Sequence, residues 1–204
     1  MKMEEPKVSK KEQKLIRERM KAKAKLRQKA PRYVILMGLP ASGKSTFSQR
    51  MQNEWRNEID KMASTSYQRN KKTSDSFLIA NQDKLGKRAC VDLVSKHAKS
   101  HRIIIDRCNP LESDRYEWVQ LLNNPPKSQI ALIYFAGNVE DCIERAKERV
   151  GHETIPEGRG ERIIRDIARR METPTLNERQ NQFGTVFEIE SFDQCDDILR
   201  MWGC

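Results

Sequence analysis

Residues Gly38 to Ser45 have the composition and spacing of a loop that binds nucleotide phosphates. They read GLPASGKS and match GxxxxGK(S/T), in which glycines let backbone N–H groups converge on phosphate oxygens. In this pattern Lys44 reaches the β and γ phosphates, and the Ser45 hydroxyl coordinates Mg²⁺. The alternative is a glycine-rich turn that matches by chance. The predicted nucleotide-binding residues are Gly38, Leu39, Pro40, Ala41, Ser42, Gly43, Lys44, Ser45 and Thr46.

A carboxylate suited to general-base catalysis follows the apolar run FLIA (77 to 80). Asp83 lies in NQDKLGKR, at the carboxyl end of a strand that should neighbour the phosphate loop. Because such strand ends line the crevice where α/β sheets bind ligands, we expect Asp83 to accept the proton of an attacking hydroxyl. The alternative is that Asp83 only caps the helix that follows. The chain has no NKxD motif, with which many nucleotide switches read the base.

A second carboxylate, Asp106, ends the apolar run RIIID (102 to 106). An acid at this place resembles the metal-linked acid of phosphate-loop proteins, which lies near Mg²⁺ or its waters. The predicted metal site therefore consists of Ser45 and Asp106. Asn109 and Pro110 then form a turn before the next helical pattern. A purely capping role for Asp106 is the alternative.

Two arginines one helical turn apart are placed to close over the phosphates. Arg145 and Arg149 share a helix face because they are four residues apart. The helix runs into GHETIPEGRG (151 to 160), whose glycines and central proline are typical of a hinged lid, predicted at about 145 to 165. An arginine that arrives on closure stabilises charge on the transferred phosphoryl group. The alternative is a solvated face shared with neighbouring glutamates.

The elements that must position these residues alternate between short apolar runs and longer helical patterns. Continuously apolar runs are typical of strands buried on both faces of a parallel sheet. The strand candidates are 33 to 37, 77 to 80, 102 to 106, 129 to 135 and 185 to 190. The helical patterns lie at about 44 to 60, 84 to 99, 112 to 123, 138 to 150, 159 to 171 and 193 to 202. This order predicts a three-layer α/β fold of the P-loop kinase type with a mainly parallel central sheet.

The 204 residues suffice for one α/β domain with an appendage, so we expect a catalytic domain at 32 to 204. The net charge of +10 is concentrated in the preceding arm: residues 1 to 32 hold 13 Lys/Arg and 4 Glu, a net +9. This basic arm, residues 1 to 31, is predicted to be helical from 9 to 29 or disordered, with no core on which to dock. It suits an anionic polymer or an anionic membrane surface, or is a solvated tail. The segment 61 to 75 is polar and turn-rich and is predicted to be a basic surface loop.

The five scattered cysteines form no CxxC pair or Cys/His cluster, which favours reduced thiols in an intracellular protein. No apolar stretch approaches the roughly 20 residues that span a bilayer, so no membrane partner is expected. Acidic residues in the arm argue against a mitochondrial presequence. The basic run KAKAKLRQK is instead consistent with nuclear import.

With these motifs in order, the chain from Tyr33 to Phe192 resembles the kinase domain of the polynucleotide 5'-hydroxyl kinases. The similar segments are GLPASGKSTF, NQDKLG, IIIDRCNPLESDRYEWV and METPTL. The resemblance implies transfer of the γ-phosphate of ATP or GTP, with Mg²⁺, to the 5'-OH end of DNA or RNA. It implies catalytic roles for Lys44, Asp83, Arg145 and Arg149. It also implies acceptor-binding roles for Asp106, Asn109, Lys87 and Arg88, and a nucleic-acid partner.

The chain departs from that family at Gln82, where an arginine is usual, so we expect contacts to the acceptor phosphate at Lys87 or Arg88. A phosphatase or ligase module has no room in the chain and would come from a separate partner. Two other functions stay open. A small-molecule P-loop kinase for a sugar acid or nucleoside shares the loop and the lid. A nucleotide-switch RNA-binding factor would tolerate the loss of Asp83, whereas a kinase would lose most of its turnover.

Overall fold

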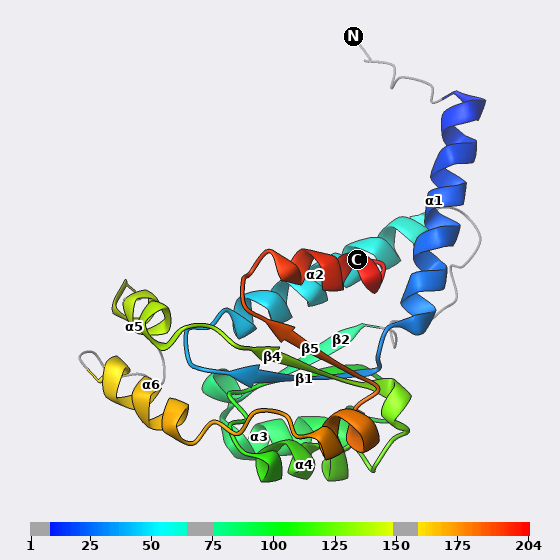
Figure 1. The fold of residues 1–204 in the computed structure, drawn as a ribbon. Coiled ribbons are helices and arrows are strands. Elements are labelled where there is room, and N and C mark those ends of the chain that lie inside the picture. The colour runs from blue at the N-terminus through cyan, green and yellow to red at the C-terminus, as the bar shows by residue number, and fades with distance from the viewer. Residues whose placement is uncertain (1–8, 65–75, 149–158) are drawn as a thin grey trace.

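A five-stranded sheet lies between two layers of helices (Figure 1). The computed structural model describes residues 9–64, 76–148 and 159–204. The strands are β1 (Tyr33–Gly38), β2 (Phe77–Asn81), β3 (Arg102–Asp106), β4 (Ile130–Phe135) and β5 (Thr185–Ile189). Their order is β2-β3-β1-β4-β5, and each neighbouring pair of these described strands is parallel. The predicted three-layer α/β fold is therefore confirmed.

Helices cover both faces of the sheet because its central strands are apolar on both sides. On β1, Val34 and Leu36 belong to one buried cluster, and Ile35 and Met37 belong to another. The helices are α1 (Lys10–Lys29), α2 (Lys44–Ser64), α3 (Gln82–His97), α4 (Glu112–Leu121), α5 (Val139–Glu148), α6 (Gly160–Arg169) and α7 (Gln194–Met201). α2 and α7 form one layer, and α3 and α4 form the other (Figure 1).

The observed boundaries follow the predicted ones closely, with one extension. α2 continues to Ser64 and so includes the start of the segment predicted as a loop at 61 to 75. The remainder of that segment, 65–75, lies outside the described residues. Two short elements were not predicted, a 3₁₀ helix at Lys127–Gln129 and a π-helix at Glu178–Gln182.

A buried ion pair joins the π-helix to α4. Arg115 donates hydrogen bonds of 2.6 and 2.8 Å to the two carboxylate oxygens of Glu178, and both side chains have 0% exposure. Arg115 Nη1 also donates to the carbonyls of Asn109 and Pro110 at 3.1 and 3.2 Å. The pair therefore fixes the turn that follows β3, where the predicted site begins.

The C-terminal half of α1 packs on the sheet domain, so the expectation that the arm has no core on which to dock is wrong there. Arg27 is 6% exposed, its guanidinium carbon lies 4.0 Å from the Trp55 ring centroid, and Nη2 donates a 2.6 Å hydrogen bond to the Trp55 carbonyl. Lys23 pairs with Glu58 at 3.1 Å. The N-terminal half of α1 projects away from the sheet (Figure 1). The docking was missed because a guanidinium on an aromatic face buries a residue that sequence patterns count as polar.

Among the described residues, no helix is both long enough and apolar enough to cross a bilayer.

Candidate phosphoryl-transfer site

The phosphate loop leaves the carboxyl end of β1 and opens α2, in the arrangement predicted from its sequence. Gly38 has φ +141°, and a Cβ built there would lie 2.7 Å from the Phe135 carbonyl oxygen. Gly43 has φ +101°, which side chains disfavour. The two glycines are therefore required by the turn itself. The first N–H groups of α2 have no acceptor within the helix, so they are available to an anion.

Lys44 is folded back into this loop. Its Nζ donates to the Gly38 carbonyl at 3.0 Å, the Leu39 carbonyl at 2.5 Å and Ser42 Oγ at 3.3 Å, and the residue is 6% exposed. All three acceptors are neutral. A phosphate oxygen is a stronger, charged acceptor, so Lys44 is positioned to exchange these bonds for a bound nucleotide.

A polar network joins the ends of β2 and β3 behind the loop. Asp106 is 4% exposed, and its Oδ2 accepts hydrogen bonds from Ser48 Oγ at 2.9 Å and Asn81 Nδ2 at 2.7 Å. Asn81 Nδ2 also lies 3.4 Å from Ser45 Oγ. The structure thus brings Ser45 and Asp106, the predicted metal ligands, to one network. Hydroxyl and carboxylate oxygens are the ligands that Mg²⁺ prefers, so these residues fit that ion.

Asn81 also caps α3, because its Oδ1 accepts a 2.9 Å hydrogen bond from the Lys84 N–H. The alternative role for Asp83, capping this helix, therefore belongs to Asn81. Sequence reasoning missed Asn81, although an asparagine between a strand and a helix is a recognised N-cap signal. Capping leaves the Asp83 carboxylate exposed, and it makes no hydrogen bond or ion pair within the part of the chain that the structure describes. Gly86, with φ +78°, separates this first turn from the rest of α3.

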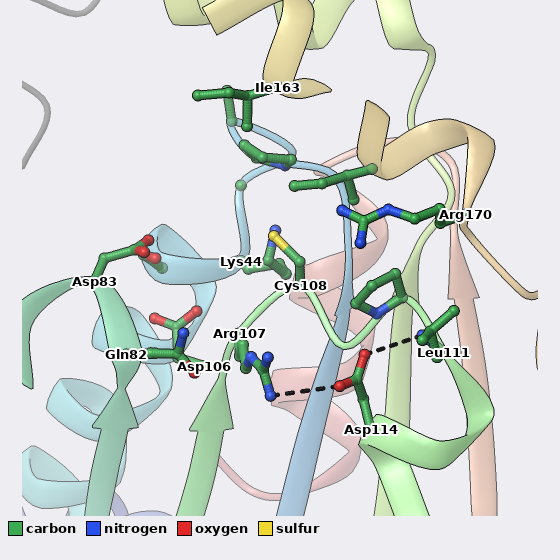
Figure 2. Close-up of a pocket in the computed structure, with 16 residues that line it drawn as sticks. Lys44, Gln82, Asp83, Asp106, Arg107, Cys108, Leu111, Asp114, Ile163 and Arg170 are labelled. Atoms are coloured by element: carbon green, nitrogen blue, oxygen red, sulfur yellow. Dashed lines mark hydrogen bonds and ion pairs between the residues drawn. The ribbon is translucent and has the colours of Figure 1, made fainter. Parts of the chain in front are cut away.

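These groups line a pocket of about 350 Å³ at the carboxyl end of the sheet (Figure 2). Asp83 and Gln82 lie on one side, and Arg170 lies on the opposite side. The lining residues are Pro40, Ala41, Gly43, Lys44, Ser45, Gln82, Asp83, Asp106, Arg107, Cys108, Pro110, Leu111, Asp114, Ile163, Ile167 and Arg170. Sequence reasoning did not select Arg107 or Arg170, because no motif spacing connects them.

The predicted lid rests on the phosphate loop through α5 and α6. Leu39 of the loop shares a buried cluster with Cys142, Ile143 and Ile164. Arg145 Nη1 donates a 3.2 Å hydrogen bond to the Ala41 carbonyl, and its Nη2 lies 3.7 Å from an Asp141 oxygen. The structure thus places Arg145 against the loop. Arg149 and the centre of the lid, within 149–158, lie outside the described residues.

The remaining predicted acceptor residues do not line the pocket. Asn109 has 0% exposure, donates to the Leu36 carbonyl at 2.7 Å and accepts from Trp118 Nε1 at 3.0 Å. Its polar atoms are thus used to position the β3–α4 turn. Lys87 and Arg88 are exposed on α3. Their side chains are available to a ligand that extends beyond the pocket.

Neutral thiols flank the site. Burial raises the pKa of Cys90 on α3 and of Cys142 on α5, so both keep their protons at neutral pH. A protonated thiol is a poor nucleophile and a poor metal ligand. Within the described ranges, no cluster of three or more His, Cys, Asp or Glu side chains could hold a metal ion. A metal at Ser45 and Asp106 would therefore depend on phosphate oxygens and water for its other ligands.

Comparison with known proteins gives the family and the fold. A sequence model of the family described as "Chromatin associated protein KTI12" matches residues 32–202. The fold resembles a Chaetomium thermophilum Kti12 in complex with ADP-AlF3, with a TM-score of 0.57, 16% identity, and coverage of 82% of this chain and 95% of that chain. It also resembles a gluconokinase from Sinorhizobium meliloti, with a TM-score of 0.51, 12% identity, and coverage of 85% and 89%. No curated protein matches the sequence. The chain belongs to the KTI12 family and has a P-loop kinase-like fold.

Proposed function

We propose that this member of the KTI12 family is a phosphotransferase that moves the γ-phosphoryl group of a nucleoside triphosphate to a hydroxyl. The observation that carries the proposal is the position of Asp83, whose exposed carboxylate has no hydrogen-bond or ion-pair partner among the described residues and lines the same pocket as Lys44 and Ser45. A general base must lie within reach of both the acceptor and the phosphates. The Kti12 in complex with ADP-AlF3 supports a nucleotide on this loop, because AlF3 has the planar shape of a phosphoryl group in transfer.

In the proposed reaction Asp83 removes the hydroxyl proton as the acceptor oxygen attacks the γ phosphorus. The bond from that phosphorus to the oxygen bridging the β phosphate breaks, and the nucleoside diphosphate leaves with the electron pair. Lys44 binds the β and γ oxygens in place of its present carbonyl partners. Arg145, already at the Ala41 carbonyl, supplies a second positive charge beside the loop. Ser45 and Asp106 would hold Mg²⁺, which neutralises phosphate charge when it is bound.

The pocket volume restricts the part of the acceptor that reacts. About 350 Å³ accommodates a small hydroxyl compound, such as a sugar acid or nucleoside, or the terminal nucleotide of a chain. The volume thus fits either kind of acceptor, and a small-molecule acceptor is our first candidate. ATP and GTP are both candidate donors.

The 5'-OH end of DNA or RNA is the second candidate acceptor, and the charge of α1 favours it. The helix contains ten Lys/Arg and two Glu, and its N-terminal half projects into solvent (Figure 1). Clustered basic side chains bind nucleic acid by releasing counterions from its phosphates. The family description as chromatin-associated and the basic run within α1 support a place in the nucleus. A separate phosphatase or ligase would then complete end processing.

The test is transfer of label from γ-labelled ATP or GTP with Mg²⁺ to three acceptor sets: sugar acids and nucleosides, 5'-OH DNA, and 5'-OH RNA. Asp83→Asn should lower transfer by about 10² or more while nucleotide binding survives. Asp92→Asn is the matched control, because Asp92 is exposed on the same helix outside the pocket. Label in one set identifies the acceptor. If every set stays unlabelled while nucleotide binds, the proposal falls, and a nucleotide-dependent switch becomes the favoured function.

A further inference from the structure

Two buried polar atoms in the pocket lack hydrogen-bond partners among the described residues. One is Gln82 Oε1, an acceptor beside Asp83, and the other is Arg107 Nη1, a donor across the pocket. A buried polar group without a partner is unfavourable, and in a pocket it is available to a bound ligand, an ion or water. The ligand they fit offers hydrogen-bond donors such as hydroxyls to Gln82 and an anionic oxygen to Arg107.

Arg107 forms an ion pair with Asp114 that lacks a hydrogen bond. Its Nη1 lies 3.6 Å from Asp114 Oδ1, beyond hydrogen-bond distance, and the side chain is 22% exposed. Asp114 is itself held by the Leu111 N–H, which donates to Oδ2 at 3.3 Å. Asp114 therefore directs the guanidinium toward the pocket but leaves its hydrogen-bonding capacity open.

Arg170 brings a second guanidinium to the same pocket. Its Nε donates to the Asp166 carbonyl at 3.3 Å, and Figure 2 shows the side chain extending back over the pocket. The neighbouring Arg169 instead pairs with Asp166 at 3.0 Å, is 74% exposed and does not line the pocket. Two adjacent arginines thus have different surroundings, and one of them faces the site.

Five other residues that line the pocket are apolar or weakly polar: Cys108, Pro110, Leu111, Ile163 and Ile167. None of the lining residues comes from α5, from α7 or from the turn before α7. Arg145, by contrast, reaches the loop from α5, through Ala41. The pocket thus contains Arg170, across from Asp83, and Arg107, and neither belongs to the helix that carries Arg145.

We propose that Arg107 and Arg170 form a second anion-binding subsite, which holds a phosphate or carboxylate group carried by the phosphoryl acceptor. The acceptor then spans the pocket, with its anionic group at the arginines and its reacting hydroxyl at Asp83 and Gln82. Arginine suits this role because its planar fork matches phosphate and carboxylate oxygens and does not lose its charge. The inference deepens the proposed function and rests on it for the word acceptor, but the subsite itself is tested by binding alone.

The experiment measures binding of inorganic phosphate by calorimetry with the phosphate loop already filled by Mg²⁺ and the non-hydrolysable analogue AMPPNP. Arg170→Gln and Arg107→Gln should each weaken phosphate binding by about tenfold or more. Arg169→Gln is the matched control and should leave it unchanged. If AMPPNP does not bind, inorganic phosphate could bind at the empty phosphate loop instead. The same measurements are therefore repeated in a Lys44→Ala background, in which the loop lacks its lysine.

The source of the anion is resolved by replacing phosphate with gluconate or with a nucleoside 3'-monophosphate. Stronger binding of gluconate indicates a small sugar acid, and stronger binding of the nucleoside 3'-phosphate indicates a nucleic-acid end. Phosphate binding that Arg170→Gln leaves intact, or that Arg169→Gln reduces equally, overturns the proposal. Asp83→Asn separates the two claims, because it should abolish transfer and retain phosphate binding. If no acceptor set receives label but phosphate binding still depends on Arg170, the proposed function is refuted and the anion-binding subsite is retained.

Discussion

Asn81 Nδ2 donates a 2.7 Å hydrogen bond to Asp106 Oδ2, and the two residues are register partners at the ends of β2 and β3. The same amide lies 3.4 Å from Ser45 Oγ, while its oxygen caps α3. One side chain thus positions both predicted metal ligands and the first turn that presents Asp83. It acts through its neighbours and is a positioning residue.

Replacement of Asn81 by Ala should raise the Mg²⁺ concentration needed for half-maximal binding of a fluorescent ATP analogue by several-fold. The reason is that Asp106 loses one of its two hydrogen bonds and gains freedom to turn from the metal. Loss of the cap should also lower the free energy of unfolding by about 1 kcal/mol. Asn53→Ala, at an exposed position of α2, is the control. An unchanged Mg²⁺ dependence in Asn81→Ala would show that Asp106 needs no such support.

The buried pair Arg115 and Glu178 should dominate the stability of the β3–α4 turn. Glu178→Leu or Arg115→Met leaves an uncompensated buried charge, which should cost about 3 to 5 kcal/mol of unfolding free energy. The double variant should be more stable than the sum of the two losses predicts, because neither charge remains. Urea titration of the four proteins in this cycle gives the coupling energy.

The control for that cycle is the pair Arg179 and Glu188, which has a similar 3.1 Å contact but is 38% and 46% exposed. Its coupling energy should be below about 1 kcal/mol, because water and salt screen exposed charges. Equal coupling energies for the buried and the exposed pair would contradict the expectation.

Features that are set by residues close together in the sequence could be predicted, and features that depend on residues far apart could not. The strands were predicted to within about one residue because continuous apolar runs such as YVILM belong to a buried parallel sheet. The phosphate loop was predicted because its chemistry fixes both residue types and spacing. Arg115 and Glu178 could not be paired from sequence, since they are 63 residues apart and look like surface charges.

Within the site, sequence reasoning selected residues at strand ends but could not tell which side chains turn inward. Asn109 was expected to bind the acceptor, yet its positive φ of 44° directs its amide to Leu36 and Trp118. Arg170 was not selected because only the packing of α6 against the phosphate loop and α5 brings it to the pocket. Such placements depend on packing between distant segments, which no motif records.

The free energy of unfolding should decrease above about pH 9, because the buried thiol of Cys195 resists losing its proton in the folded state. The residue has 0% exposure, and burial raises its pKa from 9.0 to about 11. The folded chain keeps this proton up to about pH 11, whereas the unfolded chain releases it near pH 9. The free energy of unfolding therefore decreases as pH rises between these two values, because only the unfolded state gains stability by losing the proton. The loss should be on the order of 2 kcal/mol.

The measurement for Cys195 is the free energy of unfolding at pH 8 and at pH 10.5, in the wild type and in Cys195→Ala. The variant should be less stable at pH 8 because it leaves a cavity, but its decline toward pH 10.5 should be smaller than that of the wild type. Ile198→Val, also in the α7 core, should lower both values equally. If the free energy of unfolding falls by the same amount between pH 8 and pH 10.5 in the wild type and in Cys195→Ala, groups other than Cys195 cause the loss.

The attachment of α1 should depend on Arg27 more than on any of its exposed basic residues. Arg27 stacks 4.0 Å from the Trp55 ring centroid and donates a 2.6 Å hydrogen bond to the Trp55 carbonyl, so Arg27→Ala removes both contacts. Together these contacts are worth about 1 to 3 kcal/mol, enough to increase local opening of the helix several-fold or more. Hydrogen exchange of the full chain should therefore accelerate in Lys21 to Lys29, where α1 lies on the domain.

Lys25→Ala is the matched control for Arg27→Ala, because Lys25 is exposed two residues away on the same helix. Exchange in the N-terminal turns of α1 should change little in either variant, since that half projects away from the sheet (Figure 1). Equal exchange in wild type and Arg27→Ala would mean that other contacts hold the helix, such as the 3.1 Å pair of Lys23 with Glu58. Faster exchange confined to Arg27→Ala would instead identify one guanidinium on one indole as the attachment, which fixes the direction in which the basic half of α1 points.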